Sequence, residues 1–288
     1  MKRKVILICA ASIAFLLSLG IMLYPIVSNA YNEKHHAYLM EDYSIQIEQA
    51  DGTELIEARE QAIAYNQSLQ PGVQTADPFS KEAFLAAAGN YYDLLNMNGS
   101  GIMGYIEIPT IDVHLPIYHG TDDATLQKGV GHLLGSSLPV GGSSTHTILT
   151  GHSGMASQRM FTDLPQLCEG DTFYLHIYGE TLAYRVYFKD DVYPHETNLL
   201  QIQNERDLCT LVTCTPIGVN TYRLLVMADR IPYEETEMVA DAKTEETVES
   251  AWAQNYLKGI IVGLAAVAVI VLIAVSIWLI WRRCHESR

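Results

Sequence analysis

Two long apolar stretches lie near the ends of the chain, and between them short apolar runs alternate with polar turns. Residues 5–27 and 259–281 each hold 23 residues without a charged side chain. With a rise of ~1.5 Å per residue, a helix of that length crosses a hydrocarbon layer of ~30 Å. The pattern predicts two membrane-spanning helices, of which the second anchors the mature protein.

The first apolar stretch is open to two interpretations. Ser28-Asn29-Ala30 fits a small-x-small cleavage site, which would make residues 1–30 a signal sequence that is removed. An apolar stretch of 23 residues is longer than the usual signal core of about 7–15 residues. A retained N-terminal anchor is therefore the favoured interpretation.

Periodicity between the two stretches predicts helices first and strands afterwards. Apolar residues at helical spacing predict a helix over residues 31–70, ended by Pro71-Gly72, and a second short helix over 81–95. After the break at residues 98–101, β-branched and aromatic runs predict strands at 103–108, 113–118, 147–150, 172–177, 181–193, 208–214 and 223–231. Such a series of short strands is typical of an all-β sandwich or barrel.

Charge gives these elements an orientation. The chain has 18 basic and 33 acidic side chains, and basic residues flank the outer side of both apolar stretches. Cationic flanks predict cytoplasmic termini and an extracellular middle region. Without Lys258, which flanks the second stretch, the region between the stretches has 11 basic and 32 acidic side chains, a net charge of −21 that disfavours nucleic acid as a partner. Residues 233–258, acidic and rich in threonine, predict a solvated tether.

The cysteine and histidine patterns argue against a metal. Three cysteines, Cys168, Cys209 and Cys214, lie between the apolar stretches, so at least one stays unpaired, and a Cys168–Cys209 disulfide is left open. The chain has no CxxC pair, and its histidines lack ligand spacing. We expect neither a metal nor a cofactor.

One cysteine, one histidine and one arginine have a pattern that fits nucleophilic catalysis. Cys214 ends an apolar strand, His152 follows another strand in a glycine-flanked turn, and Arg223 comes nine residues after Cys214, the length of a hairpin. An imidazolium can stabilise a thiolate and protonate a leaving amine, and an arginine can stabilise an oxyanion. Each residue alone is more often structural, Cys214 as a core thiol and His152 as a turn residue. Together they favour acyl transfer.

The segment Thr210-Leu-Val-Thr-Cys214 followed by Arg223 resembles the TLxTC signature of the sortase family. Residues 214–226 resemble the class C, pilus-assembling branch, and further matches lie at 104–109, 115–120, 129–132, 137–142 and 150–152. The resemblance implies a mainly β fold, a closed barrel of about eight strands with N-terminal helices and flanking transmembrane helices. It implies Cys214 as the nucleophile, His152 as the acid/base, Arg223 as the substrate- and oxyanion-stabilising residue, and a weak substrate contact at Thr213.

The sequence departs from the family pattern at two positions beside this set. Ser153 stands where an arginine frequently follows the histidine, and Met227 stands where a basic residue is common. Neither is a member of the catalytic set, so we expect an effect on substrate preference only.

Asp77-Pro78-Phe79 is similar to the lid of class C sortases. There the acid contacts the active-site arginine and the aromatic ring covers the thiol. The chemistry is consistent, because a carboxylate pairs well with Arg223, Pro78 restricts the bend and Phe79 excludes water. The alternative interpretation is that Asp77 caps a helix over 81–95.

The resemblance implies a domain order and a function. Residues 1–30 form a signal or anchor, 31–100 a helical lead-in with the lid at about 70–80, 101–232 the catalytic barrel, 233–258 the tether, 259–281 a transmembrane helix and 282–288 a cytoplasmic tail. The expected reaction cleaves an LPxTG-like signal of a pilin subunit and joins it to a pilin lysine at the cell membrane. The alternatives are a housekeeping sortase that uses a cell-wall peptide, and a non-catalytic, membrane-anchored binding module.

Overall fold

The computed structural model describes residues 2–69, 77, 79–80, 89–233, 250, 254, 256–265 and 267. It divides into two compact units, one of residues 1–22 and 249–288 and one of residues 23–248. The expected helix at 81–88, most of the tether and the end of the second apolar stretch lie outside the described residues.

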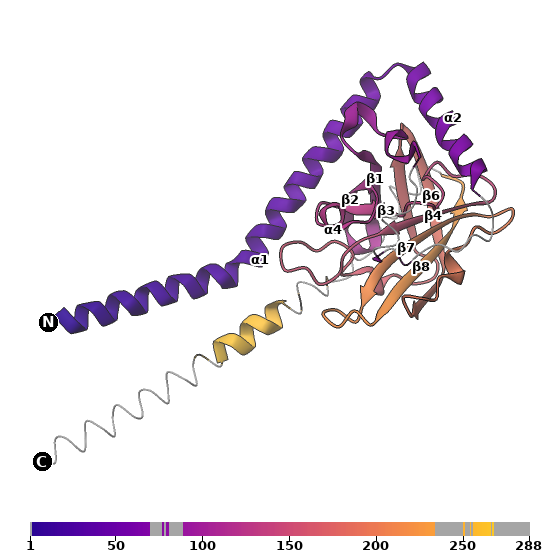
Figure 1. Cartoon of the computed structure of the whole chain (residues 1–288). Coiled ribbons are helices and arrows are strands. Elements are labelled where there is room, and N and C mark those ends of the chain that lie inside the picture. The colour runs from indigo at the N-terminus through magenta and orange to yellow at the C-terminus, as the bar shows by residue number, and fades with distance from the viewer. Residues whose placement is uncertain are drawn as a thin grey trace, which may run out of the picture. The chain divides into compact units, whose positions relative to one another are not determined.

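The chain begins with a long helix, α1 (Lys2–Gln49), which includes the first apolar stretch and contains Pro25 (Figure 1). Within the described part of the chain, one helix is long and apolar enough to cross a membrane, and it is the Phe15–Gln49 part of α1. The described part of the second apolar stretch is also helical, over Tyr256–Ala265.

The predicted helix over residues 31–70 is wrong in one respect, because it is interrupted. The helix α1 ends at Gln49, and α2 (Gly52–Ser68) follows. Asp51 between them has extended backbone angles, φ −66° and ψ 128°, and its side chain accepts a hydrogen bond from Thr53 N at 3.1 Å. An aspartate that satisfies a free N–H in this way starts a new helix, which periodicity of the apolar residues does not reveal.

The end of the second expected helix is also different. Residues 89–90 form a turn and Tyr91–Asp93 form the 3-10 helix η1, so the described part of 81–95 contains no α-helix. Tyr91 is fully buried, and its hydroxyl lies 2.9 Å from His132 Nδ1 and accepts from Gly120 N at 3.0 Å. Packing of this one side chain determines the local path of the chain.

Eight strands close into a barrel in the order β1-β2-β3-β4-β7-β8-β6-β5. Their bounds are β1 (Ile102–Ile108), β2 (Val113–His119), β3 (Val130–His132), β4 (Thr145–Thr150), β5 (Thr172–Ile177), β6 (Glu180–Val192), β7 (Asp207–Thr215) and β8 (Tyr222–Ile231). The expected closed barrel is confirmed. Seven strands were predicted; β3 was missed because three residues containing a glycine have no detectable alternation.

Short helices lie in the connections of the barrel. They are η2 (Met97–Gly99), η3 (Pro109–Ile111), α4 (Asp123–Leu126), η4 (Leu164–Gln166) and η5 (Asn198–Leu200). The segment with η5 joins β6 to β7 and is held against the barrel by buried His146, whose Nδ1 lies 2.9 Å from Gln201 O. Burial lowers the pKa of His146 to about 4, so this contact is made by a neutral ring.

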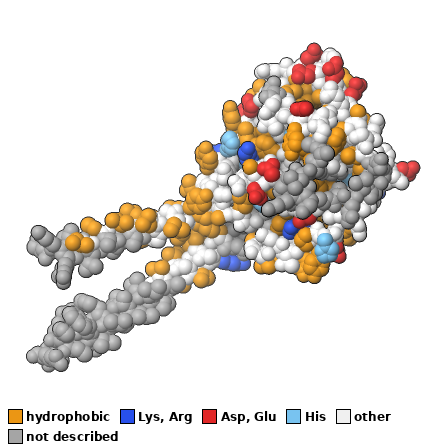
Figure 2. All heavy atoms as spheres, in the orientation of Figure 1, with side chains coloured by type: hydrophobic (Ala, Val, Ile, Leu, Met, Phe, Trp, Pro, Cys, Tyr) orange, Lys and Arg blue, Asp and Glu red, His pale blue; other side chains and the backbone are white. Residues whose placement is uncertain are grey.

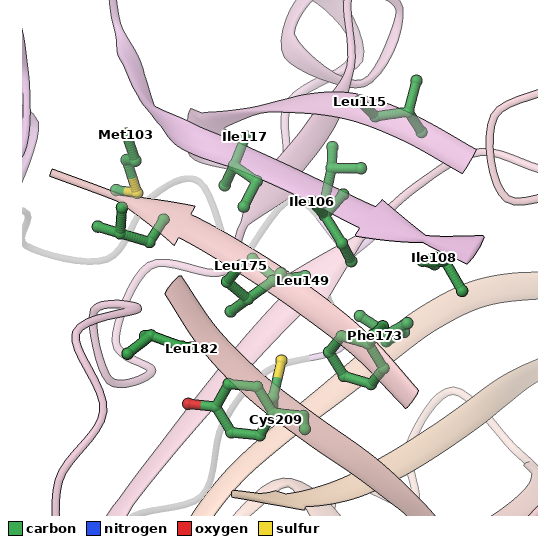
Figure 3. Packing of buried hydrophobic residues seen from close by; sticks show 14 of the residues in the cluster. Met103, Ile106, Ile108, Leu115, Ile117, Leu149, Phe173, Leu175, Leu182 and Cys209 are labelled. Carbon is green, nitrogen blue, oxygen red and sulfur yellow. The ribbon is translucent and has the colours of Figure 1, made fainter. Parts of the chain in front are cut away.

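Alternation along each strand separates two apolar layers. Side chains such as Ile106, Leu149, Leu175 and Cys209 point into the barrel and pack together (Figure 3). Residues of opposite phase, including Val212, form a second cluster outside the barrel with Ile148, Val192, Leu200, Leu225 and Met227. Phe79 and Leu199 pack on this outer cluster. The cysteines also separate: Cys209 is buried, Cys168 is exposed, and both are free.

Helix α2 is fastened to the barrel by one buried amide. Asn66 Nδ2 donates to Leu138 O at 3.0 Å, and Leu138 N donates to Asn66 Oδ1 at 2.7 Å. Leu138 is fully buried, and its carbonyl also accepts from Val140 N at 2.8 Å, so without Asn66 it is the Leu138 N–H that loses its partner in an environment poor in water.

We therefore expect Asn66→Ala to lower the free energy of unfolding by about 2 kcal/mol and the Tm by roughly 4–8 °C. Thermal unfolding followed by near-UV circular dichroism measures the change. The matched control is Gln67→Ala on the exposed face of the same helix, which is expected to stay within about 0.5 kcal/mol of the wild type. Equal effects of the two substitutions would contradict a specific role of the Asn66–Leu138 hydrogen bonds in holding α2 on the barrel.

Candidate active site

Strand pairing places the predicted thiol and guanidinium side by side. Cys214 and Arg223 are direct partners in the antiparallel pair β7–β8, so their side chains lie on the same face. That face is the outer one, because Val212 and Leu225, two residues earlier and later, belong to the outer cluster. Cys214 is half-buried at the end of β7, on the same face as this cluster.

His152 reaches the same place through parallel pairing. Thr150 of β4 is the partner of Val212 of β7, and Gly151 N continues the ladder by donating to Val212 O at 3.0 Å. His152 and Cys214 thus lie two residues beyond a paired position on neighbouring parallel strands. The register brings all three predicted residues, Cys214, His152 and Arg223, to one end of the barrel.

Ser153 ties the histidine loop to the strand of the cysteine. Its hydroxyl donates to Cys214 O at 2.6 Å. Gly151, before the histidine, lies so close to the Phe161 ring that a Cβ atom would overlap it. These contacts hold His152 between two fixed neighbours. The sequence signalled Ser153 only as a departure from the family pattern, because its partner is a backbone carbonyl 61 residues away.

The expected substrate contact of Thr213 is corrected by its position. Its side chain points to the opposite face of β7 from Cys214, is fully buried, and donates to Gly151 O at 2.7 Å. A substrate at the sulfur cannot reach a hydroxyl inside the barrel. Thr213 instead fixes the backbone immediately before His152.

Asp77 and Phe79, two residues of the expected lid, lie against Arg223 and His152. Arg223 Nε and Nη2 donate to the two carboxylate oxygens of Asp77 at 2.9 and 2.8 Å, a bidentate pair in which each side chain is 13% exposed. The Phe79 ring centroid lies 4.9 Å from Arg223 Cζ and 6.0 Å from the centroid of the His152 ring. Pro78 lies outside the described residues.

Electrostatics in this closed arrangement favour a neutral thiol and a neutral imidazole. Burial raises the pKa of Cys214, Arg223 opposes the shift, and the Asp77 carboxylate adds to it. Burial lowers the pKa of His152, with partial opposition from Asp123 of α4. The expected thiolate–imidazolium pair is therefore disfavoured while Asp77 and Phe79 cover the site. Asp123 was not anticipated, since nothing in its local sequence points to His152.

Residues 106–231 match the model of the sortase domain. The chain is 39% identical to a sortase C of Streptococcus pneumoniae, with 68% of this chain and 97% of that chain covered and a TM-score of 0.62. The chain belongs to the sortase family.

Other solved structures point to the same branch of the family. This sortase is 40% identical to the pilus-related sortase C of Group B Streptococcus, covering 67% of this chain and 97% of that one with a TM-score of 0.62. Sortase C-1 of Actinomyces oris is 45% identical, covering 62% and 99% with a TM-score of 0.56. Sortase D of Bacillus subtilis is 32% identical over 44% of this chain. The match spans about three fifths of that curated relative.

For this sortase, we expect Phe79→Ala to speed alkylation of Cys214 by roughly ten-fold, because a packed ring is worth about 1.5 kcal/mol against opening. Peptide-level mass spectrometry after iodoacetamide measures the rate at Cys214. The exposed Cys168 in the same sample serves as the internal control. An unchanged rate at Cys214 would rule out occlusion of the sulfur by the ring.

The charge of Asp77 affects how the alkylation rate of Cys214 depends on pH. The Asp77 carboxylate raises the pKa of Cys214, so Asp77→Asn removes a negative charge and lowers that pKa. Alkylation requires the thiolate, and its rate rises with pH through the pKa. We expect the midpoint of the rate–pH profile to move to lower pH in Asp77→Asn. The exposed Asp190→Asn is the matched control, and a midpoint moved equally by both variants would contradict a local effect.

Proposed function

We propose that this protein is a membrane-anchored cysteine transpeptidase that polymerises pilin subunits. Its substrate is an LPxTG-like sorting signal, cleaved through a thioacyl intermediate, and its acceptor is a lysine amine of another pilin. The observation that carries the proposal is the register that brings Cys214, Arg223 and His152 together at one end of the barrel. The likeness to a pilus-related sortase C supports the pilin substrate.

In the first step, the sulfur of Cys214 attacks the carbonyl carbon of the Thr–Gly bond. The thiol proton passes to His152 as the C–S bond forms, and Arg223 stabilises the oxyanion that develops on the carbonyl oxygen. His152 then gives the proton to the glycine nitrogen, and the C–N bond breaks. The products are a thioester on Cys214 and a free glycine amine on the departing peptide.

In the second step, a lysine amine attacks the thioester carbon. His152 accepts a proton from the attacking nitrogen and returns it to the sulfur as the C–S bond breaks. The product is an isopeptide bond between two pilins, and the thiol is regenerated. The same three side chains serve both steps.

The closed site fits a resting enzyme. Asp77 occupies both donor groups of Arg223 that an oxyanion or a peptide carbonyl would use. Phe79 lies over Arg223 and His152. We infer that Asp77, Pro78 and Phe79 form a lid that must leave before the sorting signal binds.

Anchoring in the membrane concentrates enzyme and substrate. We infer that α1 and residues 259–281 cross the membrane, with the barrel outside and both termini in the cytoplasm. Pilins held in the same membrane then meet the enzyme in two dimensions, which raises their effective concentration. The long apolar part of α1 supports this arrangement.

We expect the full chain to convert purified pilin into covalent ladders on denaturing gels, and Cys214→Ala to reduce this by roughly 10³-fold or more. Cys168→Ala, the same substitution at an exposed free cysteine, is the matched control and should form ladders normally. Ladders made by Cys214→Ala would refute the enzymatic proposal. No ladders with pilin, but attachment to a cell-wall peptide amine, would favour a housekeeping sortase.

A further inference from the structure

The part of α1 that follows the apolar stretch holds the active-site loop. Arg159 N donates to Asn29 Oδ1 at 2.9 Å, and Asn32 Nδ2 donates to Ser157 O at 3.0 Å. His36 continues the same helix face, with Nε2 3.0 Å from Lys128 O. Positions 29, 32 and 36 follow helical spacing, so one face of α1 binds the loop that begins at His152, through Asn29 and Asn32, and the segment before β3, through His36.

The opposite face of the same segment has the marks of a membrane boundary. The charge-free stretch ends at Val27, two residues before Asn29, a rise of only ~3 Å along a helix. Tyr24 and Tyr31 lie two turns apart on one face and are 57% and 71% exposed. Tyrosine is enriched where a helix passes from hydrocarbon to water. Figure 2 shows hydrophobic side chains along the described part of α1.

Short connections lead from this boundary to the nucleophile. Ser157, bound by Asn32, is three residues from Gly154, a reach of about 10 Å at most. Gly154 lies against Ile217 of the β7–β8 loop so closely that a Cβ atom would overlap the isoleucine. Ser153 beside it donates to Cys214 O. The mouth of the active site, formed by residues 151–158 and 214–222, is therefore close to the end of the apolar stretch.

The mouth also differs from the rest of the domain in charge. Residues 151–158 and 214–222 contain no Asp, Glu, Lys or Arg, although residues 28–257 have 43 such side chains. Ile217 and Val219 project from the second of these loops and are 46% and 69% exposed. Uncharged loops with projecting apolar side chains suit an interfacial lipid environment and not bulk water.

We propose that the mouth of the active site lies on the membrane surface, with Ile217 and Val219 in contact with lipid headgroups and upper acyl chains. This inference relies on the proposed function in one respect, the membrane anchoring of α1. It commits to the bilayer as the occupant of this apolar tip, because the tip is connected through Gly154, Ser157 and Asn32 to the helix that enters the lipid. A peptide substrate that itself leaves the bilayer would then meet Cys214 at its point of exit.

The test is depth-dependent quenching in the full chain. Trp252, Trp278 and Trp281 are replaced by Phe, and single tryptophans are introduced as Val219→Trp, Leu16→Trp and Ser143→Trp. Ser143 is exposed before β4, at the end of the strand opposite to His152, and Leu16 lies within the apolar stretch. Each protein is reconstituted into phosphatidylcholine vesicles without bromine, with bromine at acyl carbons near the headgroup, or, for position 16, with bromine at acyl carbons near the bilayer centre. Circular dichroism checks that each variant is folded.

We expect tryptophan at position 219 to lose roughly half of its fluorescence in brominated vesicles, because interfacial side chains lie within about 5–10 Å of the headgroup boundary. Tryptophan at 143 should keep its fluorescence, and Thr221→Trp in the same loop as Val219 should behave like Val219→Trp. Equal quenching at 219 and 143 overturns the inference. Absence of quenching at position 16 refutes the membrane anchoring and with it the inference, whereas quenching at 16 but not at 219 or 221 refutes the inference alone.

Discussion

The pairing of β4, β7 and β8 is the constraint on which the site depends. The antiparallel register fixes Cys214 beside Arg223, and the parallel register carries His152 to the same end. A shift of one residue in either pair would turn a side chain of the candidate site to the other face of the sheet. Buried neighbours prevent such a shift, because Leu211 and Val212 must enter different apolar layers.

Asp77 pairs with the same guanidinium that the proposed reaction requires. A bidentate carboxylate satisfies Arg223 in a largely desolvated place, where an unpaired charge would be costly. The negative charge of Asp77 also works against ionisation of Cys214. One short segment thus keeps the cation paired and the sulfur protonated. Under the proposed function, a substrate replaces Asp77 at Arg223, so resting and reactive forms are linked by competition for this guanidinium.

Hydrogen bonds from side chains to backbone carbonyls position His152. Thr213 donates to Gly151 O and Ser153 donates to Cys214 O, so the residues on both sides of the histidine are tied to β7. Asn29 and Asn32 of α1 hold the later part of the same loop. The histidine loop is therefore linked both to the nucleophile and to the helix that continues into the apolar stretch.

The sequence by itself determined the two apolar stretches, seven of the eight strands and the identity of the candidate residues, because these depend on local composition, alternation and a distinctive motif. Only the tertiary structure decided what depends on distant partners. The break at Asp51, the strand β3, the inward position of Thr213 and the link from Ser153 to Cys214 all follow from packing or hydrogen bonds. The protonation state of Cys214 also depends on distant partners, because burial and Asp77, 137 residues earlier in the chain, both raise its pKa.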